Sequence, residues 1–381
     1  MKINLRTGMK KYLIISILIV TSALVYGMYE LSHSHIKLPN TTGDFGVGTT
    51  YLHLIDKSRK EFHKPEENRE LFVQVYYPTD KNYSGNAEKY LKLNSEHVKK
   101  SIADMKNISI DKLSYVNNLK THSIFNAKIS NQEPNYPVVL FSPGFGSPQD
   151  TYTSYLEDIA SHGYIVLGIN HPYVTDPTVF LDGRVIFQDS EFKKPDSEKK
   201  KELEFNTWLQ DIKFLIAELK NINIENKIFK NKLNLNQLGV MGHSFGGRLA
   251  VEAARHDTRI KAGIDLDGKL TPDISLSGFD TPFMFIVAQR KDTKDQDRIE
   301  RLQKNITNDA YLVIIKNADH GTFTDLNLVF KPWLYQGNID PQIGIEITRK
   351  YIYSFFNKYL KNRPINILKD IQYADVQISR N

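Results

Sequence analysis

The sequence predicts an α/β fold with a mostly parallel central sheet flanked by helices, on three grounds. Short apolar runs typical of buried strands alternate with helix-compatible segments through most of the chain. Residues 137–142, 150–162 and 164–170 follow one another as strand, helix and strand, the order of a right-handed parallel crossover. Another apolar run ends at Gly242 and passes through a sharp turn into a second helix-compatible segment.

The composition allows one large catalytic domain and argues against a nucleic-acid partner. The chain has 381 residues, of which 40% are hydrophobic and 25% charged, as in ordinary globular proteins. Four basic side chains and no acidic one lie in residues 1–11, so only two of the six net positive charges remain on the rest. A nucleic-acid-binding domain would need a basic patch on its folded surface. Because the chain has no cysteine, disulfides, thiolate metal sites and a cysteine nucleophile are excluded.

The N-terminus predicts export from the cytoplasm. Its basic residues precede an apolar stretch, 12–29, that contains no charge, which is the order of a signal sequence. Residues 1–29 are therefore expected to be a signal peptide, cut after the imperfect site Val25-Tyr26-Gly27, or a membrane anchor. A stretch of 18 residues is near the minimum for spanning a bilayer. Both outcomes place the body in the periplasm or outside the cell, secreted or anchored.

Residues 30–45 are expected to form a linker. His33 and His35 within it have no acidic or cysteine neighbour, so solvent exposure is a better interpretation than a metal site.

The catalytic body is expected to span residues 46–381, with two surface insertions. Strands are predicted at 51–55 and 70–77, the second ending at Pro78. The first insertion, 80–132, is polar and lysine-rich, with weak helical periodicity at 87–105. The second, 171–204, contains a tight hairpin turn at 181–185 and a charged run at 193–204 that suits a solvated face or a loop over the active site.

The rest of the body continues the alternation of strand and helix. A helix with one apolar face is predicted from Phe205, and strands at 262–266, 282–287 and 311–315. A charged helix at 294–304 separates the last two strands, and a long helix covers 342–360. The tail from Lys361 has no clear assignment.

Gly242-His243-Ser244-Phe245-Gly246 is the motif that indicates chemistry. It is a G-x-S-x-G sequence between a strand and a helix, the context in which this motif presents a nucleophilic serine in an α/β-hydrolase fold. Such a turn exposes the hydroxyl over a helix N-terminus, where free N–H groups can hold developing negative charge. Ser244 is therefore the expected nucleophile. A glycine-rich turn with an exposed serine is the less favoured interpretation.

The general base is expected to be His320. In this fold the order along the chain is serine, acid and histidine, and only His256 and His320 follow Ser244. His256 lies about three helical turns from the motif, about 18 Å away, and cannot reach it. His320 follows the last predicted strand, where the base must stand, while His243 is expected to have a packing role.

The orienting acid is expected to be Asp267. Asp265 and Asp267 share one face at the end of a predicted strand, and only Asp267 lies past its edge, beside the expected position of His320. The alternative is the acidic cluster after the next strand, formed by Asp292, Asp295 and Asp297.

The oxyanion is expected to be held by two backbone N–H groups, those of Phe245 and of Phe145 in the turn after strand 137–142. This chemistry requires no cofactor and no metal ion.

Seven segments resemble the platelet-activating-factor acetylhydrolase family in its secreted, α/β-hydrolase form. The likeness covers roughly 46–360 and rests on TYLHLID (50–56), RELFVQVYYP (69–78), FSPGFG (141–146), ASHGYIV (160–166), GVMGHSFGG (239–247), GIDLD (263–267) and DHGTFTD (319–325). The GIDLD segment resembles the family's acid segment and so supports Asp267. The sequence departs from the family at Pro143, where the animal enzymes have histidine, and along 176–204.

The resemblance implies calcium-independent hydrolysis of short or oxidised acyl chains at the second glycerol position of phospholipids. A related bacterial branch contains polyester and short-ester hydrolases. Three alternatives therefore remain: a polyester or general short-chain esterase, a catalytically silent binding protein of this fold, and a membrane-anchored structural protein. The expected partners are an ester or phospholipid and, if residues 12–29 are kept, a membrane.

Overall fold

The computed structural model describes most of the chain from residue 36 onward. The described residues are 36–91, 99–100, 103–104, 108–113, 116, 119–194, 197–290, 293–330 and 338–381, with 15, 19–22 and 24 near the N-terminus. The chain forms two units, Met1–Lys37 and Leu38–Asn381. His33, His35 and most of the predicted signal or anchor segment 1–29 lie outside the described residues. Among the residues described, no helix is both long and apolar enough to cross a membrane.

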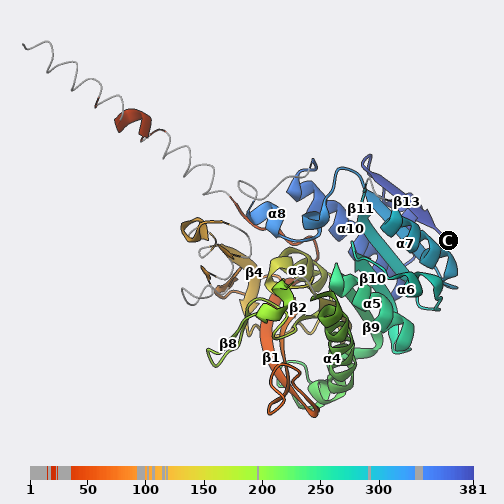
Figure 1. The fold of residues 1–381 in the computed structure, drawn as a ribbon, viewed down its shortest axis with the longest axis horizontal. Coiled ribbons are helices and arrows are strands. Elements are labelled where there is room, and N and C mark those ends of the chain that lie inside the picture. The colour runs from red at the N-terminus through yellow and green to blue at the C-terminus, as the bar shows by residue number, and fades with distance from the viewer. Residues whose placement is uncertain are drawn as a thin grey trace, which may run out of the picture. The chain divides into compact units, whose positions relative to one another are not determined.

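The second unit contains an eleven-stranded sheet with the order β13-β12-β11-β10-β9-β5-β6-β2-β1-β4-β3 (Figure 1). The six strands from β12 to β6 in this order are parallel, while β13 and β2 flank them in antiparallel pairing. This arrangement confirms the predicted fold class. The strands of the sheet are β1 (Gly46–Lys60), β2 (Asn68–Thr79), β3 (Ala87–Lys89), β4 (Lys120–Phe125), β5 (Tyr136–Ser142), β6 (Ile165–Asn170), β9 (Leu233–His243), β10 (Ile260–Leu266), β11 (Phe283–Ala288), β12 (Ala310–Ile315) and β13 (Val376–Arg380).

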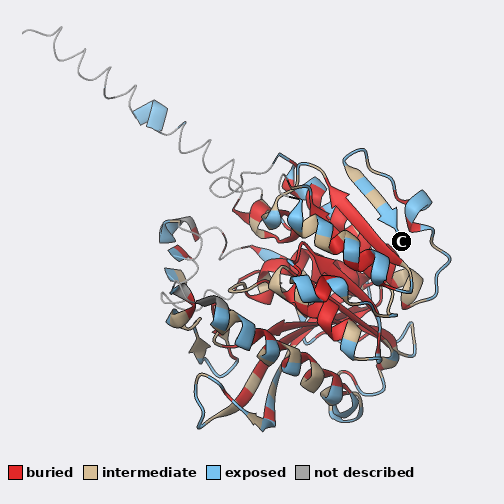
Figure 2. Cartoon of the chain, turned by 45° about the vertical axis from the view of Figure 1, so that its right-hand side comes forward, coloured by how far each residue is buried: buried red, intermediate tan, exposed pale blue. Residues whose placement is uncertain are grey.

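Helices cover both faces of this sheet, so its central strands are buried on both sides (Figure 2). Val138 and Leu140 of β5 belong to the core that includes Trp208 and Leu249, whereas Val139 belongs to the opposite core. The first face is covered by α4 (Ser197–Glu225), α5 (Phe245–His256), α6 (Pro272–Leu276) and α7 (Lys294–Asn305). The second is covered by α3 (Thr153–Ser161) and α10 (Pro341–Tyr359).

The shorter elements complete the connections. The predicted turn at 181–185 joins β7 (Thr178–Val179) to β8 (Val185–Ile186) in a separate two-stranded sheet, as expected. Among the described residues, the remaining elements are η1 (Ile110–Leu113), η3 (Gln149–Tyr152), η4 (Ser190–Lys193), η5 (His320–Phe323), α8 (Leu326–Val329) and α11 (Ile367–Asp370).

The first predicted insertion, 80–132, is only partly a surface excursion. Its segment β4 pairs in parallel with β1 in the main sheet. The side chains that β4 buries are polar, Thr121 and Ser123, so the segment lacks an apolar pattern. The carboxylate of Glu157 on α3 accepts the Ser123 N–H at 2.6 Å. This strand therefore depends on a distant partner that sequence periodicity does not reveal.

Other predicted boundaries also shift. β1 and β2 are longer than expected, and Pro78 lies within β2 rather than after it. The predicted linker 30–45 is wrong for its last residues: the compact unit begins at Leu38, and the Thr42 N–H donates to Asp158 on α3 at 2.7 Å. The unassigned tail contributes β13 at the sheet edge.

Helix α4 begins at Ser197, earlier than the predicted Phe205, and so includes most of the charged run 193–204. The charges in its first turns bind other elements: Glu202 pairs with Arg248 on α5, and Glu204 binds His63 from the β1–β2 connection. These long-range contacts explain a helical start that has no apolar face of its own.

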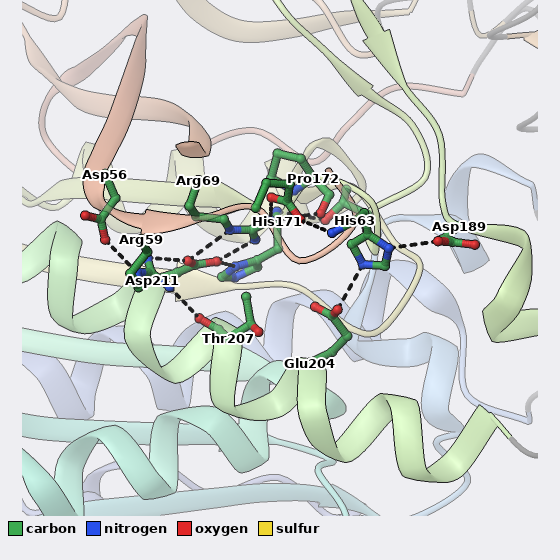
Figure 3. A network of polar contacts seen from close by, with 12 residues as sticks. Asp56, Arg59, His63, Arg69, His171, Pro172, Asp189, Glu204, Thr207 and Asp211 are labelled. Atoms are coloured by element: carbon green, nitrogen blue, oxygen red, sulfur yellow. Dashed lines mark hydrogen bonds and ion pairs between the residues drawn. The ribbon is translucent and has the colours of Figure 1, made fainter. Parts of the chain in front are cut away.

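A buried network of charges joins the β1–β2 hairpin to α4 (Figure 3). Arg69 Nη2 lies 2.7 Å from Asp211 Oδ2, and Arg69 Nη1 lies 2.7 Å from Glu61 Oε2. His171 Nδ1 lies 2.8 Å from the same oxygen of Asp211. Burial alone would raise the pKa of Asp211, but the charge of Arg69 and the hydrogen bond with His171 hold it well below its ordinary value.

His63 forms the second part of this network. Its ring bridges Asp189 of the second insertion, 2.8 Å from Nδ1, and Glu204 on α4, 2.9 Å from Nε2. Burial opposes protonation of His63, yet the two carboxylates outweigh it and raise its pKa. The network therefore holds the hairpin, the insertion and α4 together.

We expect Arg69→Met to lower the free energy of unfolding by about 3–5 kcal/mol, because it leaves the buried carboxylate of Glu61 without its cation and that of Asp211 with Arg59 alone. Urea unfolding followed by circular dichroism measures this change. Arg184→Met is the matched control: its partners Asp182 and Glu70 are more exposed, so its cost should stay below about 1 kcal/mol. Equal losses in the two variants would contradict the role given to the network.

Candidate active site

Ser244 lies at the turn between β9 and α5, in a strained backbone conformation. Its φ is 55° and its ψ −114°, a region that non-glycine residues rarely occupy. A Cβ atom at Gly242 would collide with the carbonyl oxygen of Gly246, and a Cβ atom at Gly246 with that of Ser142. The motif therefore needs both glycines, because strand, helix and the end of β5 approach closely here.

Asp267 and His320 meet in the loops that follow β10 and β12. Asp267 Oδ2 lies 2.6 Å from His320 Nδ1, and the Ala288 N–H donates to Asp267 Oδ1 at 3.1 Å. Asp267 is fully buried, whereas half of the His320 side chain is exposed. With Asp267 ionised, its carboxylate can only accept, so Nδ1 carries the proton and Nε2 keeps a lone pair that can act as a base.

Arg290 completes this pair, and the sequence analysis did not identify it. Its Nη2 lies 2.7 Å from Asp267 Oδ2, so the buried carboxylate has a cation as well as the histidine. Arg290 comes shortly after β11, in the loop row that also holds Asp267. The sequence signal that could have identified it is a basic residue, Arg290, two positions before the candidate acid Asp292.

The alternative acids lie elsewhere. Asp295 pairs with Arg290 at 3.1 Å and with Arg298 at 3.4 Å, and Asp297 accepts from the Thr293 hydroxyl at 3.4 Å. Neither binds His320 in the described structure, and Asp292 lies outside the described residues.

Asp265, two residues before Asp267, contacts the turn rather than the histidine. Its Oδ1 accepts the Gly268 N–H at 2.8 Å. Full burial, with the nearby charge of Asp267, raises the pKa of Asp265 to about 8.

His243 does more than pack, which corrects the expectation for it. Its Nε2 lies 3.1 Å from the backbone oxygen of His320, and its Nδ1 lies 2.8 Å from the Tyr152 hydroxyl. Because a carbonyl can only accept, Nε2 carries the proton and Tyr152 donates to Nδ1 in the neutral ring. Tyr152 in turn accepts the Gly144 N–H at 3.0 Å. These contacts link the loop of His320 to the turn after β5.

The structure brings Asp267 and His320 into direct contact. It places Ser244 beside them, because His243, the residue before Ser244, packs against His320. The rings of His243 and His320 are 4.4 Å apart, centroid to centroid. Among the described residues, Ser244 Oγ and His320 form no hydrogen bond, which is common for catalytic groups without a substrate. His256 is distant, as expected, and binds Glu252 on its own helix.

Phe145 and Phe245 lie against each other with ring centroids 5.3 Å apart. Phe245 is the first residue of α5, whose first N–H groups have no partner within the helix. Within the described part of the chain, neither Phe145 nor Phe245 donates its backbone N–H in a hydrogen bond. The Gly144 N–H is already used by Tyr152, which leaves the Phe145 N–H as the better candidate donor in this turn.

Trp208 on α4 connects Phe245 to the buried charge network around Asp211, a contact that the sequence analysis did not identify. Its ring stacks on His171 at 3.8 Å and meets the edge of Phe245 at 5.0 Å. Through Trp208, the buried charge network at His171 and Asp211 therefore contacts Phe245, one of the two candidate oxyanion donors.

A cavity of about 260 Å³ opens beside Ser244. Phe145 and Phe245 are among the residues that line it. Its charged lining comes from α4, α5 and the loop after β10, and consists of Lys201, Glu202, Arg248 and Lys269.

Comparison with known proteins identifies a matching family and similar chains. The family described as "Platelet-activating factor acetylhydrolase, isoform II" matches residues 30–178 and 208–370. The chain is 23% identical over 365 residues to a platelet-activating factor acetylhydrolase of Cavia porcellus, covering 86% of this chain and 79% of that protein. It is 24% identical over 369 residues to a probable 1-alkyl-2-acetylglycerophosphocholine esterase of Arthroderma benhamiae, covering 88% and 91%.

A solved structure, a ferulic acid esterase from Streptomyces cinnamoneus, superimposes with a TM-score of 0.75 at 26% identity. The match covers 90% of this chain and 98% of the esterase. The family match is interrupted at 179–207, in the region where the sequence departed from the family. From the extent of the family match, the chain belongs to the platelet-activating factor acetylhydrolase, isoform II, family.

Proposed function

We propose that this protein is a serine carboxylic-ester hydrolase that cleaves short or oxidised acyl chains from the second glycerol position of phospholipids. The observation that carries the proposal is the hydrogen bond of 2.6 Å between Asp267 and His320, beside a serine whose φ is 55°. The family membership and the names of the relatives support the ester substrate class.

Acylation begins when Ser244 Oγ attacks the ester carbonyl and His320 Nε2 takes its proton. Asp267 holds the imidazole through Nδ1 and stabilises the imidazolium that forms. The Phe145 and Phe245 N–H groups hold the negative charge of the tetrahedral intermediate. His320 then returns the proton to the leaving alcohol, and the acyl group remains on Ser244.

Deacylation repeats these steps with water as the nucleophile, which releases the carboxylic acid. Arg290 balances the charge of Asp267, so the carboxylate stays in place while His320 gains and loses a proton.

The enzyme works outside the cytoplasm in this proposal, secreted or held at the membrane by residues 12–29. The basic residues before this apolar stretch support export.

A general short-chain ester hydrolase is a second candidate function. The general esterase is favoured by the match to a ferulic acid esterase over 90% of this chain, because that enzyme has the same fold and is named for a different ester. The catalytic residues would act in the same way, and only the groups bound by the loops would differ.

Ser244→Ala should lower kcat for 4-nitrophenyl acetate by about four to six orders of magnitude, because it removes the nucleophile. A fluorophosphonate should label the unchanged protein and not this variant. A variant that kept most of the activity would refute the mechanism, and an unlabelled native protein would favour a silent binding protein.

Asp267→Asn should lower kcat by about four orders of magnitude, since the amide favours the wrong tautomer of His320. Asp295→Asn is the matched control, because Asp295 also binds Arg290 but does not touch His320. It should change kcat by less than about ten-fold. The reverse ranking would assign the acid to the later cluster.

Acyl length and head group separate the two candidate functions. Phosphatidylcholines with an acetyl or a palmitoyl group at the second glycerol position should differ strongly in kcat/KM, with the acetyl ester preferred. Equal rates for acetylated lipids with and without a phosphocholine head group would favour the general esterase.

A further inference from the structure

Asp265 is a buried acid close to the candidate nucleophile that the proposed mechanism does not use. It is fully buried on β10, where it pairs with Gly242 of β9, the first glycine of the nucleophile motif. Its neighbours Ile264 and Leu266 belong to the core covered by α3 and α10. Because side chains alternate along a strand, Asp265 points to the opposite face, which α5 covers.

The carboxyl of Asp265 lies between the start of α5 and the turn that follows β10. A Cβ atom at Gly247 or at Gly268 would collide with Asp265 Oδ1. The Cβ atom at Gly268 would also lie 2.8 Å from the carbonyl oxygen of Ser244. Oδ1 accepts the Gly268 N–H at 2.8 Å, and Gly268 is the residue after Asp267. One carboxyl oxygen therefore connects the backbone of the nucleophile turn to the turn of the acid.

The other oxygen, Asp265 Oδ2, is buried and has no hydrogen-bond partner in the part of the chain that the structure describes. Burying an ionised carboxylate in this way costs far more than burying a neutral acid. Full burial raises the pKa of Asp265 to about 8, against the opposing effects of the Gly268 N–H and of Arg290, and the charge of Asp267 raises it further. Asp265 is therefore mostly protonated at neutral pH.

The charges around Asp265 are already paired with one another. The charged groups of the elements packed around it are Asp267 and Lys269 in the loop after β10, Arg248 on α5, Arg290 after β11, and Asp295 and Arg298 on α7. Each of the four cations has another carboxylate within 4 Å. β9 and β11 place the uncharged Gly242 and Phe285 opposite Asp265. Among the described residues, an ionised Asp265 would face the charge of Asp267 without an ion pair of its own.

We propose that Asp265 is a positioning residue that must be uncharged for turnover, because as a neutral acid it holds the nucleophile turn to the turn of Asp267. The inference rests on the proposed function, since it concerns the same reaction at Ser244. Ionisation places an unpaired charge in the core, which favours movement of the carboxyl toward water and loss of its contact with Gly268. The new charge also repels Asp267 and opposes negative charge that develops beside Ser244.

The test uses Asp265→Asn, which cannot ionise and whose amide oxygen can still accept the Gly268 N–H. For the native protein, kcat/KM with 4-nitrophenyl acetate, corrected for spontaneous hydrolysis, should fall above about pH 8 by up to about ten-fold per pH unit. Asp265→Asn should retain most of the native rate at pH 7 and should lose this alkaline decline. Asp273→Asn is the matched control, because Asp273 is an exposed acid on α6, and it should keep the native pH profile.

Asp265→Ala tests the hydrogen bond separately from the charge. It leaves the Gly268 N–H without its acceptor, so kcat should fall by about ten-fold at pH 7. Restoration of the rate by asparagine at the same position distinguishes loss of the hydrogen bond from any requirement for an acid. Circular dichroism checks that each variant is folded.

The melting temperature measures the ionisation of Asp265 without using activity. The pKa of Asp265 is higher in the folded protein than the value of about 4 in an unfolded chain. The stability that its proton provides is therefore complete below about pH 4 and is lost as the pH rises to about 8. The Tm of Asp265→Asn should rise relative to that of the native protein over this range and stay level at higher pH.

An alkaline decline that persists in Asp265→Asn would overturn the proposal, as would an asparagine variant as impaired at pH 7 as the alanine variant. A difference in Tm that does not change with pH would also overturn it, because Asp265 would then not gain its charge in this range. In each of these cases, hydrolysis that requires Ser244 would leave the proposed function intact. Absence of Ser244-dependent hydrolysis in the native protein would remove both proposals together.

Discussion

The close approach of three backbone segments at Gly242 and Gly246 is the constraint on which the site depends. β9, the start of α5 and the end of β5 meet there without space for a Cβ atom at either glycine. This contact forces Ser244 into its unusual conformation and brings the turn that contains Phe145 next to the first residue of α5. The candidate nucleophile and both candidate oxyanion donors are therefore products of one packing contact. A larger residue at either glycine would separate all three.

Two buried carboxylates organise the charges around this contact in similar ways. Asp267 binds His320 and Arg290, and Asp211 binds His171 and Arg69. Their surroundings give them different roles. The His320 side chain is half exposed and can exchange a proton with a substrate, whereas His171 is fully buried under Trp208, where burial lowers its pKa. The Asp211 cluster is therefore structural, and it supports Phe245 from behind through Trp208.

The region 179–207 lies outside the family match and contributes part of the cavity wall. The family match is interrupted there, and the same region contains Lys201 and Glu202 at the start of α4. His63 holds this part of the chain to the β1–β2 hairpin through Asp189 and Glu204. The candidate catalytic residues lie in turns and loops at the ends of the sheet strands, while part of the cavity wall comes from a segment with its own anchoring contacts.

The sequence by itself determined the parallel sheet, the position of Ser244 at a strand-to-helix turn and the choice of His320 from the order of residues. These features follow from local patterns: apolar periodicity, glycine spacing and the scarcity of downstream histidines. Tertiary structure decided the partners of Asp267, the strand pairing of β4 and the early start of α4. In each of these the partner is distant in sequence, as with Arg290 for Asp267, Glu157 for β4 and Arg248 for α4. A polar or charged segment has no periodic signal of its own, because its structure is stabilised by groups that only the fold brings near.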